Sequence, residues 1–332
     1  MSIEPLAVAL GDPAGIGPEI TAKAWVERRA RALPPFFAVG SRRALAAAWS
    51  GPICTIDRPR DALAADLTGL PLIEVEHDED ISFGEPTLKG ARSALDALEF
   101  ATGLVRAGTA GALVTAPVAK SQLSAIGFRY PGQTEFIAER CGVAAANVAM
   151  MLVGPDLRTV PVTIHNSVAE IGAKLTVELI AARIATTARG LMRNFGIARP
   201  RIAIAGLNPH AGEEGLLGDE EVRLIRPAME SLATAPYTLI GPLPADTMFH
   251  QRVRETYDAA VCMYHDQALI PVKTLYFDEG VNMTLGLPIV RTSPDHGTAF
   301  DIAGQGIARP DAMVAALNLA ARAAERRAFL KD

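Results

Sequence analysis

Short apolar runs alternate with longer amphipathic stretches along the chain. Apolar runs bounded by glycine, proline or polar residues predict strands at residues 6–10, 36–40, 111–115, 148–153, 159–164, 201–207, 237–240 and 259–264. Helical periodicity predicts helices that follow residue 17 and run over residues 86–106, 175–194 and 311–326, with others beginning near residues 131 and 219. Strands that alternate with helices predict an α/β protein with mostly parallel strands. A Gly154-Pro155-Asp156 turn between two of the strands predicts a hairpin, so the sheets should be mixed.

Three histidines stand at the ends of predicted strands. His165, His210 and His265 each follow an apolar run and neighbour the turn-formers Asn166, Pro209 and Asp266. Ligands of open α/β sheets bind at the carboxyl ends of strands, and neutral imidazole is a common metal ligand. We therefore predict a metal site built from these three histidines, although a single histidine at such a place is more often a structural hydrogen-bonding residue.

The predicted metal site would be catalytic, because three protein nitrogens leave coordination positions open. A metal there could polarise a hydroxyl or carbonyl oxygen of a bound substrate. Asp246 and Asp266 are candidates for fixing the imidazole tautomers, or they could equally be helix caps. The residues after the third histidine include Lys273, Asn282 and Arg291, with Arg291 predicted at a strand end after LGLPIV. As a group they favour an anionic substrate, whereas each alone could be an ordinary surface residue.

Composition excludes several classes of protein. The 332 residues suffice for one large or two moderate domains, and 49% hydrophobic with 21% charged residues is typical of a soluble globular protein. The net charge of −5, without a basic block, argues against nucleic-acid binding. No apolar segment predicts a membrane span, and the N-terminal residues resemble neither a signal nor a transit peptide, so we expect a cytoplasmic protein. Cys54, Cys141 and Cys262 form no CxxC motif, and we expect structural or incidental thiols.

Two further segments could carry chemistry. Gly11–Gly17 links the first strand to a helix and could offer backbone N–H groups to an anion, or it could be only a tight turn before Pro18. Asp12 could cap the helix instead of contacting a ligand. Lys120 follows Thr-Ala-Pro at another strand end and could orient a substrate or assist proton transfer, or lie on the surface. The candidate catalytic residues are Lys120, Asp246 and Asp266.

The motifs GDPAGIGPE, TAPVAK, GQTEF, LNPHAGE, GPLPAD, MYHDQ and NMTLGLPIVRTSPDHGTAFDIAG occur in this order. With them, nearly the whole chain resembles the 4-hydroxythreonine-4-phosphate dehydrogenase family of pyridoxal phosphate synthesis. The segment DHGTAFDIAGQGIARP is also similar to a loop of isopropylmalate and isocitrate dehydrogenases, which bind NAD(P) without a G-x-G-x-x-G motif. On this resemblance the candidate cofactor contacts are Asp295, His296, Gly297 and Asp301.

The resemblance implies two α/β/α domains of the isocitrate/isopropylmalate dehydrogenase type, with the active site in the cleft between them. We place the first domain at residues 1–125 plus about 285–332 and the second at about 126–284. The resemblance also implies a homodimer whose subunits share the active site, and a divalent metal (zinc, magnesium or cobalt) on His165, His210 and His265. Substrate contacts would fall on Gln133, Thr134, Lys273, Asn282 and Arg291.

The implied reaction oxidises the C3 hydroxyl of 4-phosphooxy-L-threonine with NAD or NADP, and the product then loses CO2 to give 3-amino-2-oxopropyl phosphate. One position departs from the family pattern: GQTEF has Gln133 where the family has histidine, and glutamine cannot carry a charge. The alternatives are a paralogue that acts on 4-phospho-D-threonate, 4-phospho-D-erythronate or a cyclic diol carboxylate, and a non-catalytic protein that binds metal or a phosphorylated ligand.

Overall fold

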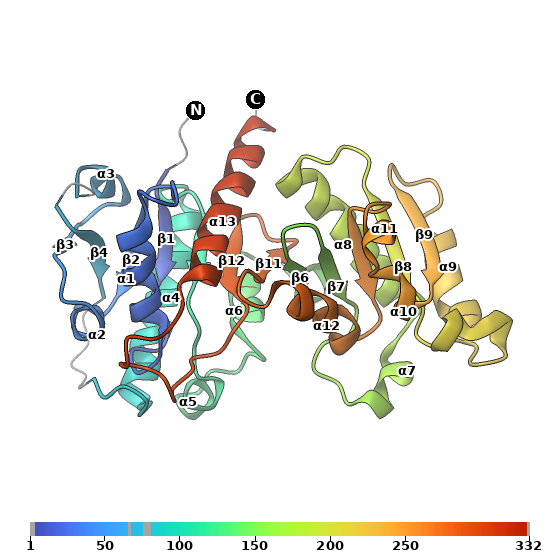
Figure 1. The fold of residues 1–332 in the computed structure, drawn as a ribbon, viewed down its shortest axis with the longest axis horizontal. Coiled ribbons are helices and arrows are strands. Elements are labelled where there is room, and N and C mark those ends of the chain that lie inside the picture. The colour runs from blue at the N-terminus through green and yellow to red at the C-terminus, as the bar shows by residue number, and fades with distance from the viewer. Residues whose placement is uncertain (1–3, 66–67, 76–80, 331–332) are drawn as a thin grey trace. The chain divides into compact units, whose positions relative to one another are not determined.

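A computed structural model describes residues 4–65, 68–75 and 81–330 (Figure 1). The chain divides into two compact units: unit 1 comprises Met1–Gly142 with Leu287–Asp332, and unit 2 comprises Val143–Gly286. Each unit is an α/β structure built on a set of neighbouring strands, so the predicted α/β class is confirmed. The predicted first segment ends at residue 125, whereas the first segment of unit 1 extends through Gly142. It includes helix α6 (Gln133–Arg140), which is hydrogen-bonded to helix α4 (Leu88–Arg106) of the same unit.

The strands of unit 1 all pair in parallel, in the order β3-β4-β2-β1-β5-β12. The strands are β1 (Leu6–Ala9), β2 (Phe36–Gly40), β3 (Ile53–Thr55), β4 (Leu70–Glu74), β5 (Leu113–Thr115) and β12 (Arg291–Pro294). The helices are α1 (Gly17–Glu27), α2 (Arg42–Ala48), the 3-10 turn η1 (Pro59–Asp61), α3 (Ala62–Ala65), α4 (Leu88–Arg106), α5 (Lys120–Ala125), α6 (Gln133–Arg140) and α13 (Asp311–Phe329). The central strands are fully buried, as continuous apolar runs in a parallel sheet require.

The strands of unit 2 pair in both parallel and antiparallel directions, in the order β11-β6-β7-β10-β8-β9. Its strands are β6 (Ala149–Val153), β7 (Arg158–Pro161), β8 (Arg201–Ala205), β9 (Thr238–Leu243), β10 (Ala259–Cys262) and β11 (Val281–Leu285). Its helices are η2 (Ala145–Asn147), η3 (Val168–Glu170), α7 (Ile171–Lys174), α8 (Val177–Phe195), η4 (Pro209–Gly215), η5 (Glu221–Ile225), α9 (Arg226–Glu230), α10 (Ala245–Met248), α11 (Gln251–Arg254) and α12 (His265–Tyr276). The β6–β7 pair is antiparallel, which confirms the predicted hairpin.

Helices pack against the strands of each unit. In unit 1, α4 packs against β1 and β2, and α13 packs against β12 and β5. In unit 2, α8 packs against β6 and β10, and α12 packs against β7. A side-chain cap defines the start of α2: the Ser41 hydroxyl accepts a 3.2 Å bond from the Ala44 amide. Among the described residues, no helix is both long and apolar enough to cross a membrane.

Candidate functional site

The apolar core of unit 1 holds a cationic side chain. Arg291 is 4% exposed, and its Nη2 donates a 2.8 Å hydrogen bond to Oγ1 of Thr115 at the end of β5. Burial lowers the pKa of Arg291 to about 10, and the negative charge of Glu135 acts in the opposite direction. A cation that has lost much of its hydration binds an anion more strongly than an exposed cation does, because less water must be displaced.

The predicted place of Arg291 at a strand end was wrong. The residues before it form a loop in which Gly286 has a φ of 87°, and Arg291 begins β12. In the sheet its Cα lies beside that of Leu113. The long side chain therefore reaches from the level of Leu113 to Thr115, at the carboxyl end of β5, where ligands of parallel sheets bind.

Gln133 and Thr134 lie at the start of α6 in the same unit. Gln133 Nε2 donates a 3.2 Å bond to the carbonyl of Ala116, the residue after Thr115. Because a carbonyl only accepts, this bond orients the amide, and Oε1 of Gln133 is buried without a hydrogen-bond partner among the described residues. A Cβ built on Gly132 would lie 3.9 Å from Cε of Lys120, so the lysine stem passes close to this helix start. The helix N-terminus adds a partial positive charge.

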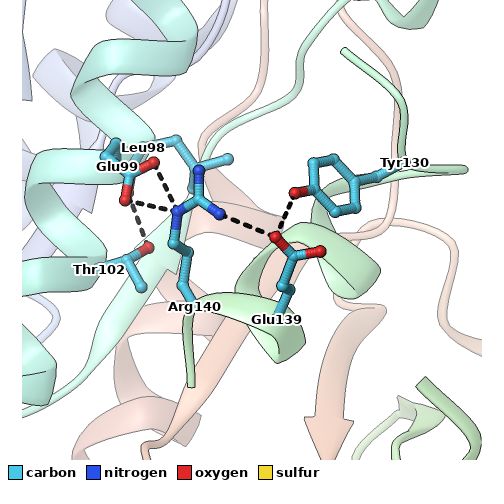
Figure 2. Close-up of polar contacts among 6 residues, drawn as sticks. All are labelled: Leu98, Glu99, Thr102, Tyr130, Glu139 and Arg140. Carbon is cyan, nitrogen blue, oxygen red and sulfur yellow. Dashed lines mark hydrogen bonds and ion pairs between the residues drawn. The ribbon is translucent and has the colours of Figure 1, made fainter. Parts of the chain in front are cut away.

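Helix α6 is anchored to α4 by a network that our sequence analysis missed (Figure 2). Arg140 Nε donates to both oxygens of Glu99, at 2.7 and 2.8 Å, and Nη1 donates to Glu139 at 3.2 Å. The Tyr130 hydroxyl donates to the same Glu139 oxygen at 2.6 Å. The guanidinium also lies 4.5 Å from the centroid of the Phe136 ring. These contacts hold the C-terminal half of α6, and so they position Gln133 at its other end.

The glycine-rich segment Gly11–Gly17 and the segment Asp295–Ala308 lie side by side in unit 1. The Ile16 amide donates to the Thr298 carbonyl at 3.1 Å. Lys23 Nζ, on α1, donates to the carbonyls of Gly306 (2.8 Å) and Ala308 (2.6 Å). Gly11 has a φ of 72°, and a Cβ there would lie 2.3 Å from the Pro117 carbonyl, so only glycine fits.

The four candidate cofactor contacts lie in this second segment. His296 Nδ1 is 3.0 Å from the Gly297 carbonyl, and the Asp301 carbonyl accepts a 2.7 Å bond from Gln305. The side chains of His296 and Asp301 are exposed, whereas Asp295 is half-buried. Asp12 does not cap α1: its Oδ1 accepts the Ala14 amide at 3.0 Å and stabilises the turn. Burial raises the pKa of Asp12, against the bonds from the Ala14 and Ala119 amides.

In unit 2 the three candidate histidines follow three neighbouring parallel strands, β7, β10 and β8. The ring centroids of His165 and His265 are 6.3 Å apart. Nδ1 of His265 is 2.6 Å from Oδ1 of Asp266, so a hydrogen on Nδ1 leaves Nε2 with a lone pair. Gln267 links the loops: it accepts the Met263 amide (2.7 Å) and donates to the Gly206 carbonyl (2.7 Å).

The chemistry of this histidine pair fits a divalent metal, because two imidazoles approach each other and one has a carboxylate on its other nitrogen. His210 is exposed on η4, and within the described part of the chain no three His, Cys, Asp or Glu side chains form a group that could hold an ion. Asp246 is exposed on α10. Lys273 is half-buried on α12, and Oδ1 of Asn282 on β11 is buried without a hydrogen-bond partner among the described residues.

The chain is similar to known proteins over nearly its whole length. The profile of pyridoxal phosphate biosynthetic protein PdxA matches residues 32–320. The chain is 52% identical over 325 residues to 4-hydroxythreonine-4-phosphate dehydrogenase of Zymomonas mobilis, covering 98% of the chain and 97% of that protein. It is 53% identical over 329 residues to the protein of the same name from Erythrobacter litoralis, covering 98% of each. A crystal structure of the Klebsiella pneumoniae enzyme of that name superposes with a TM-score of 0.86 at 37% identity, over 97% of this chain and 99% of that one.

Proposed function

The chain belongs to the PdxA family of pyridoxal phosphate biosynthetic proteins, and on that premise we propose that it is a metal-dependent, NAD(P)-linked 4-hydroxythreonine-4-phosphate dehydrogenase. The C3 hydroxyl of 4-phosphooxy-L-threonine becomes a ketone while NAD(P)+ is reduced and a proton is released. The β-keto acid then loses CO2 and gives 3-amino-2-oxopropyl phosphate. The structural observation that carries the proposal is the buried guanidinium of Arg291 beside the start of α6, a place suited to an anionic group.

The residues of unit 1 bind and orient the substrate in this proposal. Arg291 offers a planar fork to a carboxylate or phosphate. Gln133 and Thr134 contact the same ligand from the helix start, where backbone N–H groups favour an anion. Lys120 passes close to Gly132 and is a candidate for taking the hydroxyl proton. Lys273 and Asn282 are further proposed substrate contacts. The Oδ1 of Asn282, which is buried without a hydrogen-bond partner among the described residues, suits a hydroxyl or ammonium donor of the substrate.

A divalent metal held by His165, His210 and His265 would lower the free-energy cost of negative charge on the substrate oxygen during both steps. Asp266 keeps the Nε2 lone pair of His265 available by accepting from Nδ1. NAD or NADP, the two-electron oxidant, is proposed to bind along the segment Asp295–Ala308 beside the glycine-rich turn. We further propose that two copies of the chain form a homodimer that shares the site.

The test is NAD(P)H formation from 4-phosphooxy-L-threonine, with added divalent metal and again after chelation. Turnover that stops on chelation and returns with metal supports the proposal. Protein that binds metal but does not reduce NAD(P)+ with this substrate contradicts it. The same assay with 4-phospho-D-threonate and 4-phospho-D-erythronate tests whether the chain is a paralogue with another substrate. The reason for this test is that Gln133 stands where the family has histidine.

A further inference from the structure

The loop that carries His210 has a rare backbone conformation. Six successive residues have positive φ angles: 53° at His210, 53° at Ala211, 78° at Gly212, 42° at Glu213, 57° at Glu214 and 95° at Gly215. L-residues other than glycine disfavour this region, and a run of them persists only when the surrounding structure holds it. Something outside the turn must therefore compensate for its conformation.

The carboxylate of Glu221 lies inside this loop. Glu221 is 1% exposed and is the first residue of η5, a π-helical turn. Its Oε1 accepts the amides of Leu207 at 2.7 Å and Asn208 at 2.8 Å. Its Oε2 accepts the Asn208 side-chain amide at 3.0 Å. Three charge-assisted bonds thus join the buried carboxylate to the residues that lead into the left-handed turn.

The same carboxylate also lies close to the middle of the turn. A Cβ built on Gly212 would lie 2.5 Å from Oε2 of Glu221, and one on Gly206 would lie 3.1 Å from Oε1. The backbone of the loop therefore wraps around Glu221, from Gly206 at its start to Gly212 beyond His210. The position of the His210 backbone depends on contacts that lie on both sides of it along the chain.

We propose that Glu221 is the positioning residue for His210: its buried carboxylate holds the left-handed turn that presents this imidazole to a divalent metal. The inference rests on the proposed role of His210 as a metal ligand. Glu221 itself bonds the backbone of the loop and acts on the metal only through His210. Residues that orient metal ligands typically change metal affinity by about 10- to 100-fold when they are replaced.

The experiment uses the full-length protein and cobalt(II) as the probe. The variant Glu221→Gln keeps the shape of the side chain but removes the charge and two of the acceptor lone pairs. The matched control is Glu214→Gln, which alters a carboxylate on the same turn that is 88% exposed. Two quantities are measured: hydrogen exchange of the Leu207 and Asn208 amides without metal, and the cobalt dissociation constant with its visible absorption spectrum.

In Glu221→Gln we expect exchange of both amides to accelerate by about tenfold or more, the cobalt dissociation constant to rise by about 10- to 100-fold, and the spectrum to change. Glu214→Gln should behave as the wild type. Unchanged exchange overturns the inference, and so does faster exchange with an unaltered spectrum and dissociation constant. A wild type that binds no cobalt also overturns it, whereas a wild type that binds cobalt but reduces no NAD(P)+ contradicts only the proposed function.

A second variant tests the inference if the Glu221→Gln protein does not fold. Gly212→Ala leaves the carboxylate intact but places a methyl group against it at a φ of 78°. If the turn positions His210, this variant must also weaken cobalt binding by about tenfold or more. Cobalt binding equal to that of the wild type in a folded Gly212→Ala protein would overturn the inference independently.

Discussion

Arg291 and Thr115 join two separated parts of the chain through a hydrogen bond of 2.8 Å between Nη2 and Oγ1, and both side chains are buried. Thr115 ends β5 and Arg291 begins the neighbouring parallel strand β12. The bond therefore holds the guanidinium at the carboxyl edge of the sheet, next to the residues that lead into Lys120.

Replacing Arg291 by Ala is expected to raise KM for 4-phosphooxy-L-threonine by about 10- to 100-fold, the equivalent of one lost bond to a charged group at about 1.5–3 kcal/mol. Arg291→Lys should recover only part of the loss, because lysine lacks the planar fork. The control is Arg309→Ala, since Arg309 is exposed and pairs with Asp311. The KM values are measured by steady-state kinetics. An unchanged KM in Arg291→Ala would show that Arg291 does not bind the substrate.

Gln133→Leu is expected to raise the same KM by about tenfold, because the substitution keeps the volume but removes both the acceptor Oε1 and the bond to Ala116. Gln133→His restores the family residue and should stay within a few-fold of the wild type. Equal KM values in all three proteins would show that the substrate does not contact this side chain.

Asp266→Asn is expected to weaken zinc binding by about 10- to 100-fold, because the carboxylate that bonds Nδ1 of His265 is lost. Asp246→Asn is the comparison, since Asp246 is the other predicted partner and is exposed. The zinc affinities of the two variants are measured by competition with a chelating dye. A larger loss in Asp246→Asn than in Asp266→Asn would reverse our assignment.

The Asp258–Arg201 pair predicts a pH-dependent stability. Burial alone would raise the pKa of Asp258, but the bonds from Arg201, at 2.9 Å to the guanidinium and 2.7 Å to the amide, outweigh it and lower the pKa. A lowered folded-state pKa stabilises the fold above the unfolded value of about 4, and this stabilisation is lost as pH falls through the folded-state pKa. Asp258→Asn should therefore reduce Tm at pH near 7 by about 2–4 °C and by less under acid conditions. A difference that does not shrink in acid would contradict this.

The local part of the fold was readable from the sequence. Phe36–Gly40 is a strand with the predicted bounds, because an apolar β-rich run ends at a glycine before the capping Ser41. The short strands β3 and β4 were not predicted, since Pro52 and Pro71 interrupt their pattern.

The candidate site was only partly predictable. Strand-end histidines are a local pattern, so their placement after neighbouring strands could be expected. The bond of Arg140 to Glu99 joins helices far apart in sequence, and the burial of Glu221 depends on a loop that folds around it. Such long-range contacts leave no periodic signal in the chain. The position of Arg291 was wrongly predicted, because LGLPIV has the composition of a strand whereas residues 286–290 form a loop.

The interruption of unit 1 between Gly142 and Leu287 has a consequence for biosynthesis. A ribosome makes the chain from the N-terminus, and domains generally fold as they emerge. Every strand of unit 2 is synthesised before β12, so β5 is paired with β1 but still lacks its second neighbour when unit 2 can already fold. Arg291 is thus synthesised after most of the core of unit 1. A nascent chain that has already folded around Gln133 still lacks the cation that is proposed to bind the substrate.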